Sequence, residues 1–117
     1  MIITQVLAEL YGASPAIDEE AALIGAARAA AAAVGAAIVG EHAVRYVPHG
    51  LTVALFLAES HIVLTTWPEY RLVLVDLLLC NPEMDHRTAI AEIARHLCPD
   101  GQVVTHDVPR RIAATHD

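Results

Sequence analysis

Six short apolar segments, each bounded by residues that favour turns, constrain the fold of this chain more than any other sequence feature. The segments are rich in Val, Ile, Leu and Thr, and Gly, Pro or Asn interrupts the chain between most of them, a pattern typical of β-strands. The expected strands cover residues 2–10, 36–46 (with a bend at Gly40), 51–58, 61–66, 71–79 and 102–108. The second, third and fourth segments follow one another without a helix, which indicates a meander.

Two other segments are predicted to be helical. In the first, Ser14 suits the N-cap and Pro15 the first helical position, and the acidic residues that follow favour the positive end of the helix dipole. Gly35 is expected to end this Ala-rich helix. The second helix is predicted over residues 86–97, with Asp85 as its N-cap.

The order strand, helix, several strands, helix, strand predicts an α+β fold, a two-layer sandwich in which two helices cover one face of a mainly antiparallel sheet. With 117 residues, 56% of them hydrophobic, the chain fits a single domain covering residues 1–117. The strands are apolar on both sides, so the face opposite the helices needs a cover. We therefore expect a homodimer or a ligand cleft there, and a frayed tail after Pro109.

The charge of the chain argues against nucleic acid as a partner. Fourteen acidic and seven basic residues, the latter all Arg, give a formal net charge of −7, which is the wrong sign for binding a phosphate backbone. The longest weakly polar segment is mostly Ala and contains Arg28, so no membrane span is expected. The N-terminus lacks a basic segment and a cleavage site, so no signal peptide is expected either.

The cysteines and histidines give no sign of a disulfide or a metal site. Cys80 and Cys98 form neither a disulfide framework nor a CxxC pair, and the seven His are scattered without the spacing of zinc ligands. We therefore expect no metal and a reducing, cytoplasmic compartment.

Three closely spaced motifs carry the functional information. They are Ala-Glu-Ser-His at 58–61, Thr-Trp-Pro-Glu-Tyr at 66–70 and Val-Asp-Leu-Leu-Leu-Cys at 75–80. With their spacing, and with residues 6–12 and 45–50 upstream, the chain resembles the bacterial S-adenosylmethionine decarboxylases over roughly residues 5–108. The resemblance implies the two-layer fold of that family, and a precursor that cuts itself.

The chemistry of such a precursor follows from what decarboxylation requires. A carbonyl cofactor that forms a Schiff base with an amino acid can accept the electrons left by departing carbon dioxide, which no ordinary side chain can do. If the Ser60 hydroxyl attacks the Glu59 carbonyl, the amide becomes an ester, and elimination followed by hydrolysis leaves an N-terminal pyruvoyl group. The expected fragments are 1–59 and 60–117. A serine hydrolase is a poorer interpretation, because Ser60 lacks the glycines of a nucleophile elbow.

The resemblance also implies roles for several other residues. Cys80 would reprotonate the substrate α-carbon, and Glu69 would accept hydrogen bonds from the ribose hydroxyls. Tyr46 would stack on adenine, Thr52 would assist the acyl shift, and Glu9 would place negative charge near the sulfonium cation. Five residues, namely Glu59, Ser60, Cys80, Glu69 and Tyr46, are expected to line one cleft.

One position departs from the family pattern. The family reads His-Thr-Trp-Pro-Glu where this chain has Thr65 before Thr66, and a threonine hydroxyl cannot replace an imidazole as the base of the elimination step. Self-cleavage is therefore expected to be slower or absent. His61 shares strand parity with position 65 but lies about 13 Å away at roughly 3.3 Å per residue, and the placements of His49 and His42 remain open.

Three functions are compatible with this sequence. The first is a self-processing S-adenosylmethionine decarboxylase that makes the aminopropyl donor for polyamine synthesis. The second is a pyruvoyl decarboxylase of another amino acid, such as arginine or ornithine, because losing the imidazole also alters the substrate wall. The third is an uncut, non-enzymatic relative that binds an adenosyl ligand or a partner subunit.

Overall fold

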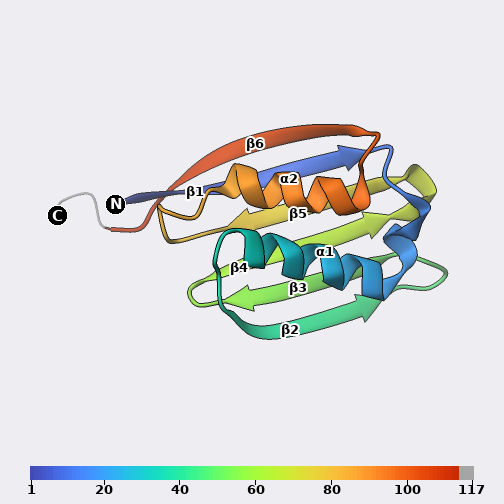
Figure 1. The fold of residues 1–117 in the computed structure, drawn as a ribbon, viewed down its shortest axis with the longest axis horizontal. Coiled ribbons are helices and arrows are strands. Elements are labelled where there is room, and N and C mark those ends of the chain that lie inside the picture. Colours follow the sequence, from blue (N-terminus) through green and yellow to red (C-terminus); the bar gives the residue numbers. More distant parts are fainter. Residues whose placement is uncertain (114–117) are drawn as a thin grey trace.

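The computed structural model describes residues 1–113 and contains one sheet and two α-helices in that range (Figure 1). The elements in chain order are β1 (Ile2–Tyr11), the 3₁₀ helix η1 (Pro15–Asp18), α1 (Glu20–Ala33), β2 (Ile38–Arg45), β3 (Leu51–Leu57), β4 (Ser60–Trp67), the 3₁₀ helix η2 (Pro68–Tyr70), β5 (Leu72–Leu78), α2 (His86–Leu97) and β6 (Gln102–Arg111).

The sheet has six strands in the order β2-β3-β4-β5-β1-β6. Every neighbouring pair is antiparallel, and β2 to β5 form the predicted meander. Both α-helices lie on the same side of the sheet, side by side (Figure 1). The predicted α+β sandwich with two helices on one face is therefore confirmed.

The first helix begins later than predicted. Ser14 does act as a cap, since its hydroxyl accepts a hydrogen bond from the Ala16 amide at 3.1 Å, but it caps only the short helix η1. The chain then turns through Glu19 in an extended conformation, and α1 starts at Glu20. Gly35, with φ of +74°, follows the end of α1 as predicted.

The second helix has the predicted bounds. It spans His86–Leu97, and the Asp85 carboxylate accepts a hydrogen bond from the Arg87 amide at 2.9 Å. Asp85 satisfies one of the free amides at the helix start, which explains why its position marked the boundary in the sequence.

The last strand is longer than predicted. It continues through Pro109 to Arg111, and Pro109 pairs with Thr4 of β1. A proline has no amide hydrogen to donate, but β6 is an edge strand with a neighbour on one side only, so a proline is tolerated there. The expectation of a frayed tail after Pro109 is thus wrong for Arg110 and Arg111, and residues 114–117 lie outside the described part of the chain.

The core lies between the sheet and the helices. Alternate residues of the four inner strands point toward α1 and α2 and are almost fully buried, among them Leu10, Leu55, Leu64 and Leu77. The Ala side chains of α1 let this helix lie close to β3 and β4 and to α2. The two edge strands are less covered.

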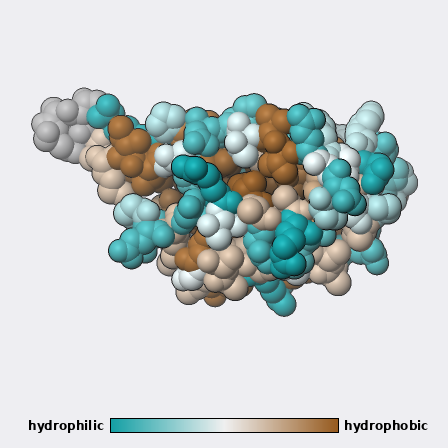
Figure 2. Space-filling model, turned by 45° about the horizontal axis from the view of Figure 1, so that its top comes forward, coloured by the Kyte–Doolittle hydropathy of each residue, from teal (hydrophilic) through white to brown (hydrophobic). Residues whose placement is uncertain are grey.

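A shallow groove of about 340 Å³ lies between α2 and β6, where the helices no longer cover the sheet. Val6, Ile90 and Val103 line this groove. Figure 2 shows hydrophobic residues at the surface among hydrophilic ones on the side where β6 lies. Within the described residues, neither α-helix is long and apolar enough to cross a membrane.

The opposite face of the sheet, called the open face below, carries no helix. Its alternate residues form rows across the strands, and one of these rows contains Thr52, Thr65, Leu74 and Glu9 in β3, β4, β5 and β1. Leu7, Phe56 and Leu74 are exposed here. Polar side chains stand between them, so the open face is less uniformly apolar than the sequence indicated.

Candidate functional site

The expected cut lies in the turn between β3 and β4. Leu57 pairs with Ser60, so Ala58 and Glu59 alone connect the two strands. Glu59 has φ of +60°, a left-handed conformation that costs a residue with a β-carbon about 1–2 kcal/mol. Ser60 is half-buried, and its hydroxyl donates a hydrogen bond to the Ala58 carbonyl at 3.3 Å. The peptide expected to react is therefore preceded by a strained residue.

Cys80 lies directly beside this turn. Its Sγ donates a hydrogen bond to the Glu59 carbonyl oxygen at 2.7 Å, across 21 residues of sequence. The contact forms because β4 and β5 are paired, so that the end of β5 lies beside the start of β4. Cys80 is only partly buried, so the sulfur is at the surface and not in the core.

A hollow of about 340 Å³ opens next to Cys80. The first residues of β1 and the segment between β5 and α2 line it, including Ile3, Asn81, Met84 and His86. The thiol therefore has space for a small molecule on one side and the Glu59 carbonyl on the other.

A second hollow, of about 360 Å³, lies at the other end of β4 and is called the tyrosine hollow below. Its lining consists of Tyr46, His49, Thr65, Thr66, Trp67 and Glu69. Inside it, the Tyr46 hydroxyl donates to Thr52 Oγ1 at 2.9 Å, and Thr52 Oγ1 lies 3.1 Å from Thr65 Oγ1. The hollow thus brings Tyr46, Thr65 and Glu69 together, and Thr52 is joined to them through hydrogen bonds.

The loop that carries His49 is held at its base. The Tyr46 amide donates to the Gly50 carbonyl at 2.9 Å, and the Gly50 amide donates to the Asp18 carboxylate at 2.9 Å. Gly50 has φ of +104°, and a β-carbon there would approach the Thr66 carbonyl oxygen to 3.2 Å. A glycine is required at this bend, and it fixes where His49 projects.

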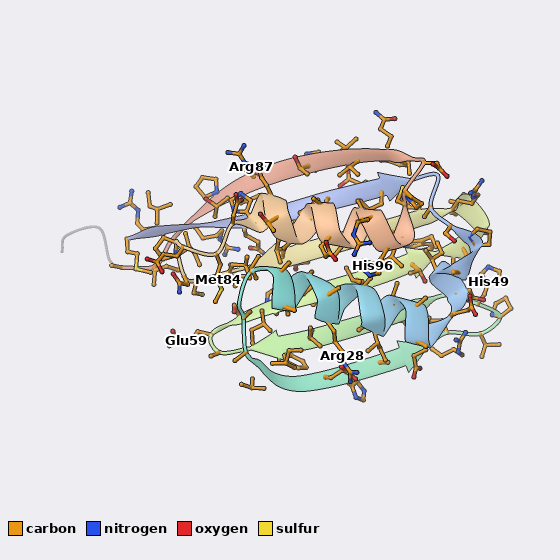
Figure 3. All side chains as sticks on the ribbon, in the orientation of Figure 1. Arg28, His49, Glu59, Met84, Arg87 and His96 are labelled. Carbon is orange, nitrogen blue, oxygen red and sulfur yellow. The ribbon has the colours of Figure 1, made fainter. Side chains whose placement is uncertain are left out.

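The two groups of residues do not share a cleft within one chain. Thr65 follows Ser60 by five strand residues, or about 16 Å at roughly 3.3 Å per residue. Figure 3 places Glu59 and His49 at opposite ends of the sheet. The expectation that Glu59, Ser60 and Cys80 line one cleft with Tyr46 and Glu69 is therefore wrong for a single copy.

Between these ends, the open face carries polar groups that the sequence analysis did not single out. Asp76 Oδ1 accepts a hydrogen bond from Gln5 at 2.8 Å and lies 3.2 Å from His61 Nε2. Strand parity could have found this cluster, because Asp76 interrupts an apolar strand. Nearby, Glu9 lies 2.7 Å from His106 Nε2.

A shallow hollow of about 240 Å³ brings Glu9, Asp76 and Thr65 to one surface. Position 65 therefore borders two hollows, which leaves room for a larger side chain. Among residues 1–113, no group of three or more His, Cys, Asp or Glu is arranged to hold a metal ion.

Comparison with known proteins places this arrangement in a family. The family model described as S-adenosylmethionine decarboxylase matches residues 4–111. The chain belongs to the S-adenosylmethionine decarboxylase family.

Individual S-adenosylmethionine decarboxylases are similar over most of the chain. The S-adenosylmethionine decarboxylase proenzyme of Pyrobaculum islandicum is 38% identical over 92 residues, which cover 77% of this chain and 74% of that protein. The proenzyme of Methanococcus maripaludis is 30% identical over 108 residues, covering 92% and 88%. The crystal structure of the adenosylmethionine decarboxylase from Aquifex aeolicus matches with a TM-score of 0.83 and 28% identity, covering 96% of this chain and 92% of that one.

Proposed function

We propose that this chain is a precursor that cuts itself between Glu59 and Ser60 and then acts as a pyruvoyl-dependent decarboxylase of S-adenosylmethionine. Its product would be the aminopropyl donor for polyamine synthesis. Family membership over residues 4–111 supports the reaction class, and nothing in the comparisons supports the alternatives of arginine or ornithine decarboxylation or a non-enzymatic role. The observation that carries the proposal is the hydrogen bond from the Cys80 thiol to the Glu59 carbonyl at 2.7 Å.

The first step is an acyl shift at Glu59. The Ser60 oxygen attacks the Glu59 carbonyl carbon, negative charge develops on the carbonyl oxygen, and the Cys80 thiol is the donor that meets it. Breaking the carbon–nitrogen bond gives an ester and a free amine on Ser60. The left-handed conformation of Glu59 is strained, and this strain can relax once elimination from the ester has freed the chain end at Glu59.

The residues around Ser60 fit the group that would form there. The Cys80 thiol touches the reacting carbonyl, and a hollow of about 340 Å³ next to Cys80 leaves space for a substrate beside the thiol. Once formed, a pyruvoyl group supplies the carbonyl that accepts the electrons left by departing carbon dioxide. Cys80 then donates its proton to the substrate α-carbon, which requires a thiol at the surface of the site.

The tyrosine hollow suits the nucleoside part of the substrate. Tyr46 presents an aromatic ring that is 46% exposed, and the Glu69 carboxylate can accept hydrogen bonds from ribose hydroxyls. Glu9, on the open face, supplies negative charge for the sulfonium cation. We assign these binding roles to the hollow and the neighbouring face.

A second copy of the chain is needed to unite these parts. We consider two copies that pack open face to open face, related by a two-fold axis that is parallel to the sheets and perpendicular to β4. This rotation reverses the direction of β4, so the Ser60 end of one copy lies over the Thr65 end of the other. The exposed Leu7, Phe56 and Leu74 would be buried in the contact. We therefore propose a homodimer with two equivalent sites, each built from both copies.

The experiment that tests this function combines intact mass with carbon dioxide release. Purified protein should contain fragments 1–59 and 60–117 in place of the 12.5 kDa chain, and Ser60→Ala should remain whole. The cut protein should release carbon dioxide from S-adenosylmethionine and not from arginine or ornithine. The proposal would be wrong if the wild-type chain stays whole and inactive and the Thr65→His variant, which restores the family imidazole, does so too.

A further inference from the structure

The elimination step needs a proton acceptor that the family pattern no longer supplies at position 65. Base-assisted elimination removes the proton on the Ser60 α-carbon and breaks the Cβ–Oγ bond of the ester. Thr65 is a neutral hydroxyl, hydrogen-bonded to Thr52 at 3.1 Å, and cannot accept that proton at neutral pH. Some other group must do so, and an imidazole is the side chain best suited to it.

Five of the six imidazoles in residues 1–113 lie outside the tyrosine hollow that contains position 65. His106 is 2.7 Å from Glu9, and His61 is 3.2 Å from Asp76. His96 lies on α2, where a ring nitrogen is 2.9 Å from the Glu92 carbonyl, and its side chain is on the helix side (Figure 3). His42 is exposed on the edge strand β2. His86 lines the hollow beside Cys80 and not the tyrosine hollow.

His49 lies in the same hollow as the position that lost its imidazole. It lines the tyrosine hollow together with Thr65, and its Nε2 is 3.3 Å from Glu69 Oε1. A carboxylate beside Nε2 favours the tautomer with the hydrogen on that nitrogen, which leaves Nδ1 as the acceptor. The side chain is 36% exposed, so the ring projects from an anchored loop and is accessible.

We infer that His49 is the proton acceptor of the elimination step, with Glu69 as its positioning residue. His49 Nδ1 takes the α-proton of Ser60, and a double bond forms between Cα and Cβ. The electron pair of the broken Cβ–Oγ bond stays on the oxygen, which becomes part of the new main-chain carboxylate of Glu59. Water then replaces the nitrogen of the resulting enamine as ammonia is released. No oxidant or reductant is required.

This inference rests on the proposed two-copy site. Within one copy, His49 and Ser60 lie at opposite ends of the sheet (Figure 3), so the acceptor for each Ser60 is His49 of the second copy. Whatever brings position 65 to the reaction centre also brings His49, because the two residues line one hollow. The loop base at Gly50 and Asp18 keeps that relationship fixed.

Single variants test the acceptor. Precursor made by a short pulse of cell-free synthesis is followed by intact mass, with wild type, His49→Ala and His42→Ala in parallel. We expect His49→Ala to slow the cut by about 10²-fold or more and His42→Ala to leave its rate unchanged. Added imidazole should restore cutting of His49→Ala, and circular dichroism should show that this variant is folded. A wild-type rate for His49→Ala overturns the inference, as does its slow cutting without imidazole rescue.

A double variant tests whether the two positions are equivalent. Thr65→His in the His49→Ala background should restore the cut to at least the wild-type rate, because the imidazole returns to the same hollow. If His61→Ala stops cutting while His49→Ala does not, the acceptor is His61 and the inference is wrong.

Mixed dimers test whether His49 acts across copies. Ser60→Ala chains cannot be cut but carry His49, and His49→Ala chains carry Ser60. When the two are synthesised together, the His49→Ala chains should be cut faster than when they are made alone, and an unchanged rate would contradict the inference.

The outcomes for the acceptor and for the proposed function can be told apart. If wild type is cut and His49→Ala is cut at the same rate, only this inference fails. If wild type and Thr65→His both stay whole, the proposed function itself fails.

Discussion

The Cys80 thiol and the Glu59 carbonyl oxygen are 2.7 Å apart, and the proposed function assigns this one sulfur two successive tasks. In the proposed mechanism, it stabilises charge on an oxygen during the acyl shift, and it loses its proton to carbon after decarboxylation. These tasks make different demands on the side chain, and substitution can separate them.

Replacing Cys80 should therefore give two distinct phenotypes. Cys80→Ala removes the donor, so cutting should slow by about 10²- to 10³-fold, the usual cost of losing one oxyanion donor. Cys80→Ser keeps a hydroxyl donor beside Glu59 and should cut near the wild-type rate, yet release little carbon dioxide because a hydroxyl is the poorer acid. Intact mass and carbon dioxide release measure the two steps. Equal cutting by both variants would contradict the first role.

Substitutions at Glu59 test the strain before the cut. In the uncut Ser60→Ala background, Glu59→Gly should be at least as stable as the parent, because glycine adopts φ of +60° freely. Glu59→Val should lose about 1–2 kcal/mol, because a β-branched side chain fits that conformation poorly. Thermal melting gives the ranking, and a valine variant that melts with the parent would show that Glu59 is unstrained.

The dimer can be tested with two substitutions of equal exposure. Leu74 on the open face is 38% exposed and Val103 on the helix side is 39% exposed. Leu74→Glu should give a monomer that is not cut, because it places a charge within the proposed contact. Val103→Glu should remain a dimer. Light scattering and intact mass report both properties, and a dimeric, normally cut Leu74→Glu protein would refute the open-face contact.

Two glycines provide a test of packing. A β-carbon at Gly101 would overlap the Tyr11 carbonyl oxygen and the Cys98 sulfur, whereas one at Gly25 in α1 would contact nothing. Gly101→Ala should therefore destabilise the Ser60→Ala precursor by about 1–3 kcal/mol. Gly25→Ala should stabilise it by up to about 1 kcal/mol through helix propensity. Opposite shifts in the unfolding midpoint are expected, and shifts of the same sign would contradict the packing described here.

Local signals explain why much of the fold could be predicted. Asp85 marked the start of α2 because a carboxylate satisfies free helix amides, and Gly35 marked the end of α1 because it adopts a positive φ. Ser14 gave an equally good signal but caps a 3₁₀ helix, because side-chain capping does not distinguish the two kinds of helix. Strand ends such as Arg111 depend on pairing with β1, which no local pattern encodes.

The candidate site was less accessible to sequence reasoning. Motif spacing brought out Ser60, Cys80 and Glu69, but spacing carries no distances, and the separation of the site into two ends followed only from the length of β4. Nothing near Glu59 predicted a left-handed residue, since glycine is the usual signal. The placement of His49 depends on Asp18, which is 32 residues away from Gly50 in sequence and adjacent in space.

The strand order β2-β3-β4-β5-β1-β6 determines what a cut at Glu59 does to the molecule. Fragment 1–59 would hold β1, β2 and β3, and fragment 60–117 would hold the other strands, so the two fragments interleave within one sheet. They cannot part without rupturing the ladders β3–β4, β5–β1 and β1–β6. Denatured precursor could refold by itself at any dilution, whereas denatured mature protein would need two chains to meet. After maturation, the rate of refolding would thus depend on the protein concentration.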